Sequence, residues 1–211
     1  MILYKRNQIE DAIARLSGYS SIAAAQELAT RIKRLLDTDR ALEFQPRSEK
    51  PELANYAFFS GGPPGKGSEV HFSGYEVFAL LIGLQMLNHE WPQKFVVESL
   101  RRLRPGLERQ HRKILRLDPT KLFDPDQVRL QAKPGSPVLA TTSPIFLLIW
   151  SDQRKAEDPA PSAEIFTDPL AAYARGIERP GRSTTWLELT KSAHLLSEQL
   201  SKSLPRKRGR S

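Results

Sequence analysis

The sequence predicts a mainly α-helical protein with one small β-hairpin, followed by an α+β C-terminal region. Apolar residues recur at helical spacing in several long stretches of the chain. A glycine- and proline-rich link joins two β-prone runs, "NYAFF" and "SEVHF", and such a link is typical of a hairpin with a long loop. The apolar run Ile145 to Trp150 has the length and composition of a buried strand.

Two amphipathic helices are predicted at the beginning of the chain. Residues 5–16 place apolar side chains at helical spacing, and Gly18 is a plausible stop. Ser20 and Ser21 can cap a second helix, "SIAAAQELATRIKRLLDTDRAL". In this helix the leucine and isoleucine side chains face inward, and three bases point outward: Arg31, Lys33 and Arg34.

The glycine-rich segment raises the question of a phosphate-binding loop. The motif of such a loop is G-x-x-x-x-G-K-[ST]: a first glycine, a second glycine five residues later, a lysine and then a hydroxyl residue. Ser60 occupies the first position and Gly67 follows Lys66, so the pattern fails at both. The segment is therefore interpreted as the tip of a hairpin that spans Tyr56–Phe72, with Lys66 on the tip.

A buried helix and a basic helix are predicted after the hairpin. Ser73 and Glu76 match the capping box, which opens an apolar helix over 75–88. Pro92 fits the first position of another helix, which begins at about Gln93. The Pro105-Gly106 pair predicts a kink or a split in that helix.

Positive charge is concentrated in two places. The net charge is +8, and residues 101–117 hold seven Lys and Arg side chains against one acid, Glu108. Charged helix faces are usually just solvated, but i,i+4 pairing cannot explain this excess. A row of guanidinium groups suits successive phosphates, so a polyanion partner is expected. The predicted contacts are Arg101, Arg104, Arg109, Arg112 and Arg116, with Arg206, Lys207 and Arg208 of the C-terminal tail.

The remainder of the chain is predicted as three segments. The strand from Ile145 is expected to pair with residues 138–141, and the proline-rich stretch 151–169 is expected to be a surface loop. A final amphipathic helix is predicted over Trp186–Leu200. The expected domains are thus residues 1–117, residues 118–204 and a disordered basic tail, 205–211.

Several classes of function are not favoured by the composition. The chain has no cysteine, and its four histidines show no metal-ligand spacing and no nucleophile–base arrangement. We therefore expect no enzyme activity, no catalytic residues, no metal and no cofactor. His71 and His89 are interpreted as structural, and His111 is expected to pack on the apolar face of its helix. The longest apolar run is about half of a bilayer span and no signal peptide is evident, which predicts a cytoplasmic protein without a membrane partner.

One stretch resembles a known family. "HFSGYEVFALLIGLQMLNHEWPQKFVVESLRRL" is similar to the second half of a MerR-type winged-helix domain, in which an aromatic-Ser pair, here Phe72-Ser73, caps a core helix before a short turn and another helix. The resemblance covers about residues 5–103. It implies a winged helix-turn-helix fold in which the hairpin is the wing and carries Lys66. The helix before the wing would then enter the DNA major groove with Arg31, Lys33 and Arg34.

Together these features predict a DNA-binding transcriptional regulator. Its partner would be double-stranded DNA, and the resemblance implies a homodimer paired through the 105–117 helix or the Trp186–Leu200 helix. The alternative is a non-enzymatic adaptor that binds a protein through residues 138–200 and has incidental nucleic-acid affinity. Single-stranded RNA binding ranks third, because aromatic residues do not alternate with the bases.

Overall fold

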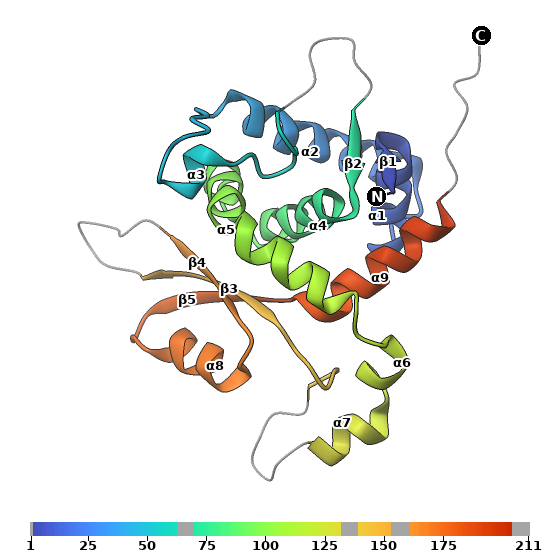
Figure 1. The fold of residues 1–211 in the computed structure, drawn as a ribbon, viewed down its shortest axis with the longest axis vertical. Coiled ribbons are helices and arrows are strands. Elements are labelled where there is room, and N and C mark those ends of the chain that lie inside the picture. Colours follow the sequence, from blue (N-terminus) through green and yellow to red (C-terminus); the bar gives the residue numbers. More distant parts are fainter. Residues whose placement is uncertain (1, 63–69, 132–138, 153–160, 204–211) are drawn as a thin grey trace. The chain divides into compact units, whose positions relative to one another are not determined.

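The structure is a computed structural model, and it describes residues 2–62, 70–131, 139–152 and 161–203 (Figure 1). Contacts divide the chain into two compact units. The first unit comprises Met1–Arg104 with Leu195–Ser211, and the second comprises Pro105–His194. The prediction of a mainly α-helical protein is confirmed, and the sheets that the structure contains are small and antiparallel.

The first unit consists mostly of helices. Its elements, in chain order, are β1 (Leu3–Lys5), α1 (Arg6–Leu16), α2 (Ile22–Ala41), α3 (Pro51–Ala54), β2 (His71–Ser73), α4 (Gly74–Asn88), the part of α5 (Gln93–Ile114) up to Arg104, and the part of α9 (Leu189–Lys202) from Leu195. Helix α4 is buried almost all round, from Tyr75 to Leu84, and it contacts α2 and β2. A helix that is apolar on every side belongs in a core.

The predicted helix starts are confirmed by their caps. The Ser21 side chain accepts a hydrogen bond from the Ala24 amide at 3.1 Å, so Ser21 is the N-cap of α2. At α4 the Ser73 hydroxyl accepts from the Glu76 amide, and Glu76 Oε2 accepts from the Ser73 amide at 2.7 Å. This is the predicted capping box, and it satisfies two amides that the helix itself cannot.

The prediction that residues 55–59 and 68–72 pair as a β-hairpin is wrong. Strand β2 pairs instead with β1 in antiparallel register, Leu3 opposite Ser73, and residues 55–59 form no strand. The reason is that side chains form hydrogen bonds with the backbone groups of residues 56–59. The Asp39 carboxylate accepts from the amides of Ala57 and Phe58, and Arg104 donates to the carbonyls of Tyr56 and Phe59. A backbone whose polar groups are paired in this way needs no neighbouring strand.

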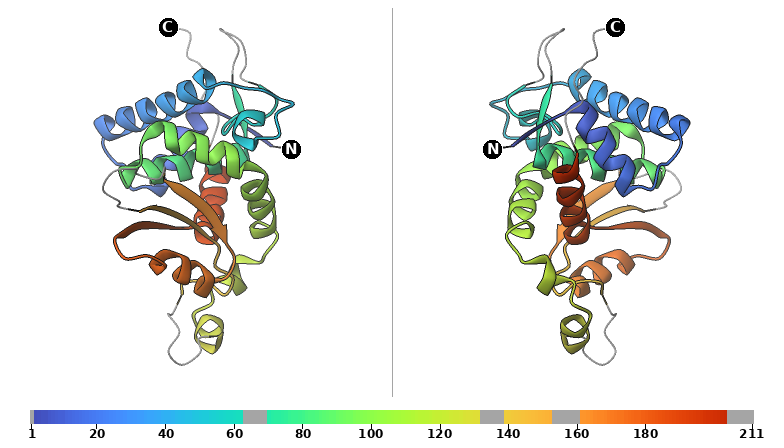
Figure 2. Two further views of the ribbon diagram at one scale, coloured as in Figure 1. Left: turned by 90° about the vertical axis from the view of Figure 1, so that its left-hand side faces the viewer. Right: turned by 90° about the vertical axis from the view of Figure 1, so that its right-hand side faces the viewer.

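The second unit contains a three-stranded antiparallel sheet in the order β4-β3-β5. Its elements are the end of α5, α6 (Pro119–Leu122), α7 (Pro125–Gln131), β3 (Phe146–Asp152), β4 (Ser162–Phe166), α8 (Pro169–Ile177), β5 (Arg182–Glu188) and the first turns of α9. The predicted strand from Ile145 is therefore confirmed, as the central strand β3. Helix α8 contacts all three strands and lies along one face of the sheet (Figure 2).

Three details of the C-terminal prediction are wrong. Residues 139–141 form no strand, and β3 pairs with β4 and β5 instead. Part of the expected surface loop is strand β4. The last helix begins at Leu189, because residues up to Glu188 belong to β5, where Trp186 meets Phe146 edge to face. The backbone of a buried strand needs hydrogen-bond partners along both edges, and β4 and β5 supply them for β3.

The units also differ from the predicted domains, because the C-terminal end of α9 returns to the first unit. The Gln8 side chain donates to the Ser203 carbonyl at 2.8 Å, across 195 residues of sequence. Pro105 lies inside α5, which continues to Ile114, so of the predicted kink or split the split does not occur. In the described part of the chain, no helix is both long enough and apolar enough to cross a bilayer.

Candidate nucleic-acid interface

Arg101, predicted as a phosphate contact, is a buried structural residue. It is 1% exposed, and its Nε donates to Asp39 Oδ1 at 2.7 Å. Its Nη1 donates to the Glu43 carbonyl at 2.6 Å, and Nη2 donates to the Asp39 carbonyl. The guanidinium also lies 5.0 Å from the centre of the Tyr56 ring. The predicted phosphate contact at Arg101 is therefore wrong, because its guanidinium donates hydrogen bonds to groups inside the first unit.

Arg104 is buried in the same way. Its Nη1 donates to the Tyr56 and Phe59 carbonyls at 2.6 Å each, and its Nη2 donates to Ser60 Oγ at 3.1 Å. Glu76 Oε1 lies 3.7 Å from Nη2 and compensates the charge. The predicted phosphate contact at Arg104 is wrong as well, and both arginines hold the 56–60 segment in place.

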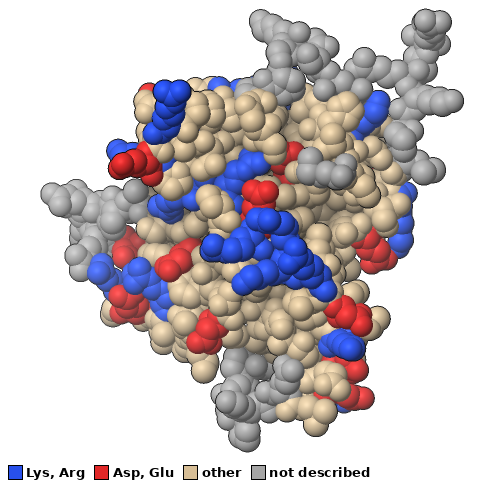
Figure 3. Space-filling view, in the orientation of Figure 1, with Lys and Arg blue, Asp and Glu red and all other residues tan. Residues whose placement is uncertain are grey.

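The exposed bases of α5 beyond Pro105, together with the base of the turn after it, form what we call the basic ridge, which consists of Arg109, Arg112, Lys113 and Arg116. All four are exposed, and their spacing of i, i+3, i+4 and i+7 places them on one face. Leu107, His111 and Ile114 are buried on the other face. Figure 3 shows Lys and Arg side chains gathered over this part of α5. Lys113 was not singled out in the sequence, although the same spacing includes it.

The ridge carries positive charge that the described residues do not neutralise. None of the ion pairs between described side chains involves any of its four members. Arg112 Nε donates only to the Glu108 carbonyl, at 3.4 Å. By contrast, Arg182 in the same unit is paired with both Asp152 and Glu178. Unpaired guanidinium groups on one exposed face can bind phosphate oxygens bidentately.

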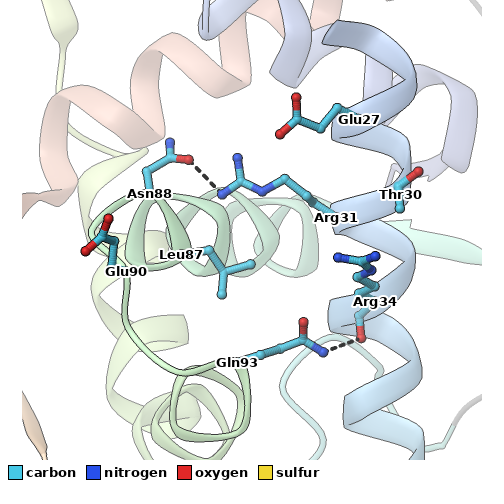
Figure 4. A pocket seen from close by; sticks show the side chains of 8 residues that line it. All are labelled: Glu27, Thr30, Arg31, Arg34, Leu87, Asn88, Glu90 and Gln93. Atoms are coloured by element: carbon cyan, nitrogen blue, oxygen red, sulfur yellow. Dashed lines mark hydrogen bonds between the residues drawn. The ribbon is translucent and has the colours of Figure 1, made fainter. Parts of the chain in front are cut away.

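Helix α2 presents the other group of predicted contacts. Lys33 and Arg34 are exposed, while Arg31 is half-buried. Arg31 crosses from α2 to the end of α4, where its Nη2 donates to Asn88 Oδ1 at 2.7 Å and to the Leu84 carbonyl at 3.3 Å (Figure 4). Arg31 therefore fastens two helices together, and Lys33 and Arg34 are the bases of this group that remain outward.

Arg31 and Arg34 line a common cleft of about 620 Å³ (Figure 4). Gln93 closes it from the start of α5, where its Nε2 donates to the Arg34 carbonyl at 3.2 Å and to Thr38 Oγ1. Glu27 and Glu90 line the same cleft, so its charge is mixed. The bases of α2 belong to the first unit and the basic ridge to the second.

Four predicted contacts lie outside the described residues: Lys66, Arg206, Lys207 and Arg208. The two helix faces proposed for dimerisation are buried within the single chain, since Leu107 and Ile114 of α5 and Leu196 and Leu200 of α9 are each at most 3% exposed. A homodimer stays a prediction, and it would need another surface.

Two histidines of the second unit, the buried His111 and the half-buried His194, lie close together. His111 is 6% exposed, as expected for the apolar face of its helix, and Phe123 meets His194 edge to face. Burial, and then the nearby His194, lowers the pKa of His111 to about 4. Burial also lowers the pKa of His194, and its Nε2 is buried without a hydrogen-bond partner among the described residues. The described residues hold no cluster of three or more metal-ligating side chains.

The interface is thus reduced from the predicted set to the four ridge residues and two bases of α2. Sequence periodicity located five of these six positions, all except Lys113, but it could not separate them from Arg101 and Arg104. Comparison of the chain with protein-family models and with curated proteins gave no match.

Proposed function

We propose that the protein binds double-stranded DNA, with the basic ridge on the phosphate backbone and with Lys33 and Arg34 of α2 as a second contact. In this proposal it is a transcriptional regulator of MerR-like organisation. The order of α1, α2, a strand, the capped α4 and α5 supports that part of the proposal, as does the aromatic-Ser entry at Phe72-Ser73.

The observation that carries the proposal is the unneutralised charge of the ridge. Four bases share one exposed face without an acidic partner among the described residues. Bases that are only solvated gain nothing from sharing one face, whereas a phosphate backbone can contact several bases on that face at once. Binding would release condensed counterions, which is the main driving force for contacts of this kind.

The test is fluorescence anisotropy with a random-sequence duplex over a salt series. Each phosphate that a base neutralises adds about −0.9 to the slope of log affinity against log salt. The double variant Arg109→Ala/Arg112→Ala should therefore flatten the slope by about 2 and weaken binding at low salt.

A matched control removes the same charge elsewhere. Arg15 and Arg129 are exposed and paired with Asp11 and Asp126, so Arg15→Ala/Arg129→Ala changes the net charge equally. This control should keep the wild-type slope. Equal loss of binding in the two double variants would mean that only net charge matters, and the ridge would not be the interface.

The role of α2 needs a separate measurement. Lys33→Ala/Arg34→Ala should weaken binding to duplexes of every sequence if these side chains contact phosphates, and only to preferred sequences if they contact base edges. If this variant binds every duplex like the wild type while the ridge variant does not, α2 is not part of the interface.

A second candidate function is a protein-binding adaptor acting through residues 138–200. It is favoured by helix α8, where Leu170, Tyr173 and Ile177 lie at i, i+3 and i+7 and are 62%, 58% and 61% exposed. An apolar stripe of this kind suits a protein partner. Adaptor binding would depend little on salt, so the same salt series separates the two functions.

A further inference from the structure

A second hollow lies inside the first unit, where the end of α1, the middle of α2 and the last half of α4 meet. Its volume is about 270 Å³, at the lower end of the range for small-molecule sites. The apolar part of its lining consists of Leu16, Tyr19, Leu28, Leu81 and Leu84. These walls would accept a compact apolar group.

Two polar groups of the lining have unused hydrogen-bonding capacity. Arg31 uses its Nη2 for Asn88 and Leu84, and no acid among the described residues forms an ion pair with it. A guanidinium has five donors, so further donors remain for an anionic group. Gln85 Oε1 is buried and accepts no hydrogen bond from the described part of the chain. Such an acceptor costs folding free energy unless a donor reaches it.

Groups that favour opposite charges border the hollow. Ser17 is the C-cap of α1, and Leu84 to Asn88 form the last turn of α4, so two helix C-termini border the hollow. The carbonyl groups of a helix C-terminus favour a positively charged group. Arg31 on α2 favours a negative one. Positive and negative potential therefore lie side by side above apolar walls.

We propose that this hollow binds an apolar α-amino acid. The carboxylate would pair with the guanidinium of Arg31, the ammonium group would donate to Gln85 Oε1, and the side chain would lie among the leucines. The zwitterion matches both polar groups, while a simple anion would leave the glutamine acceptor unpaired. This site is independent of the DNA-binding proposal, because it needs no contact from the ridge, from Lys33 or from Arg34.

The test is calorimetric titration of the full chain with L-leucine in the absence of DNA. Saturable binding is expected, and 4-methylpentanoate, which lacks the amino group, should bind about tenfold more weakly or worse. Leucinol, which lacks the carboxylate, should be weakened to a similar degree. No saturable binding of L-leucine, L-valine or L-phenylalanine would overturn the proposal.

The decisive variant is Gln85→Met, which removes the unpaired acceptor and keeps the length of the side chain. It should fold at least as stably as the wild type, because an unsatisfied buried group is lost, and yet bind leucine at least about tenfold more weakly. Gln26→Met, at an exposed glutamine of α2 that does not line this hollow, is the control and should bind leucine normally. Unchanged leucine binding in Gln85→Met would also overturn the proposal, and the DNA titration would be unaffected by either result.

Discussion

At the scale of single residues, Asp39 organises the first unit. It is fully buried, and its carboxylate accepts hydrogen bonds from the amides of Ala57 and Phe58 and from Arg101. The network joins α2, α5 and an irregular stretch of backbone. A buried ion pair stabilises little compared with apolar packing, but removal of one partner leaves an uncompensated charge.

Arg101→Ala should therefore destabilise the protein by about 3–5 kcal/mol. The variant leaves the Asp39 carboxylate without its cation and the Glu43 carbonyl without its donor. Urea unfolding followed by circular dichroism measures the change. Arg109→Ala is the matched control on the same helix, and it should lie within about 0.5 kcal/mol of the wild type. Similar stability of the two variants would contradict the structural role of Arg101.

The buried His111 and the half-buried His194 make the second unit sensitive to acid. The pKa of His111 is lowered to about 4 in the folded protein, while the unfolded chain protonates near 6.5. The unfolded state therefore binds more protons as the pH falls below about 6.5, and the free energy of unfolding decreases until about pH 4. The contribution of His111 to this loss is about 3 kcal/mol, and His194, whose pKa is also lowered, adds to it.

Urea unfolding at about pH 7.5 and about pH 5 tests this behaviour. The wild type should lose stability between the two, and His111→Phe should lose less because the titrating group is absent. His71→Phe is the control, since His71 is exposed on β2. The same pH dependence in the His111 variant and the wild type would show that other groups cause it.

At the scale of elements, the caps determine where helices begin. Ser73 is buried, and its hydroxyl and amide both bond to Glu76, whose other oxygen accepts from Ser60 Oγ at 2.6 Å. Ser73→Ala should cost about 1–2 kcal/mol through loss of the cap of α4. Ser73→Asp, which keeps an acceptor at the cap, places a second carboxylate beside Glu76 and is a poor control.

Ser73→Thr is the better comparison, because it retains the hydroxyl acceptor. Thermal unfolding should rank the three proteins as wild type, Ser73→Thr and Ser73→Ala in decreasing order. If the alanine variant were as stable as the threonine variant, the cap would not limit the stability of α4.

At the scale of the whole molecule, the first of the two units is built from both ends of the chain. The end of α9 belongs to the unit built from residues 1–104, and Leu200 there is 3% exposed. Leu200→Ala should remove about 2–5 kcal/mol of stability by leaving a cavity. Hydrogen exchange should increase in peptides from the first unit, including α1, whose Gln8 bonds to Ser203. The control, Leu170→Ala on the exposed face of α8, should not change exchange in those peptides.

The sequence by itself determined α1, α2, the buried α4 and α5, the caps of α2 and α4, the strand β3 and the excess of bases over 101–117. These features depend on neighbours a few residues away, so periodicity and capping patterns show them. Only the tertiary structure decided which bases are exposed. Arg101 and Arg109 have the same charge and lie on the same helix, but Arg101 meets Asp39, 62 residues distant in sequence, and Arg109 meets no acid among the described residues. Side chains distant in sequence, those of Asp39 and Arg104, also kept residues 56–59 out of a strand, because backbone groups that are already paired gain nothing from a sheet.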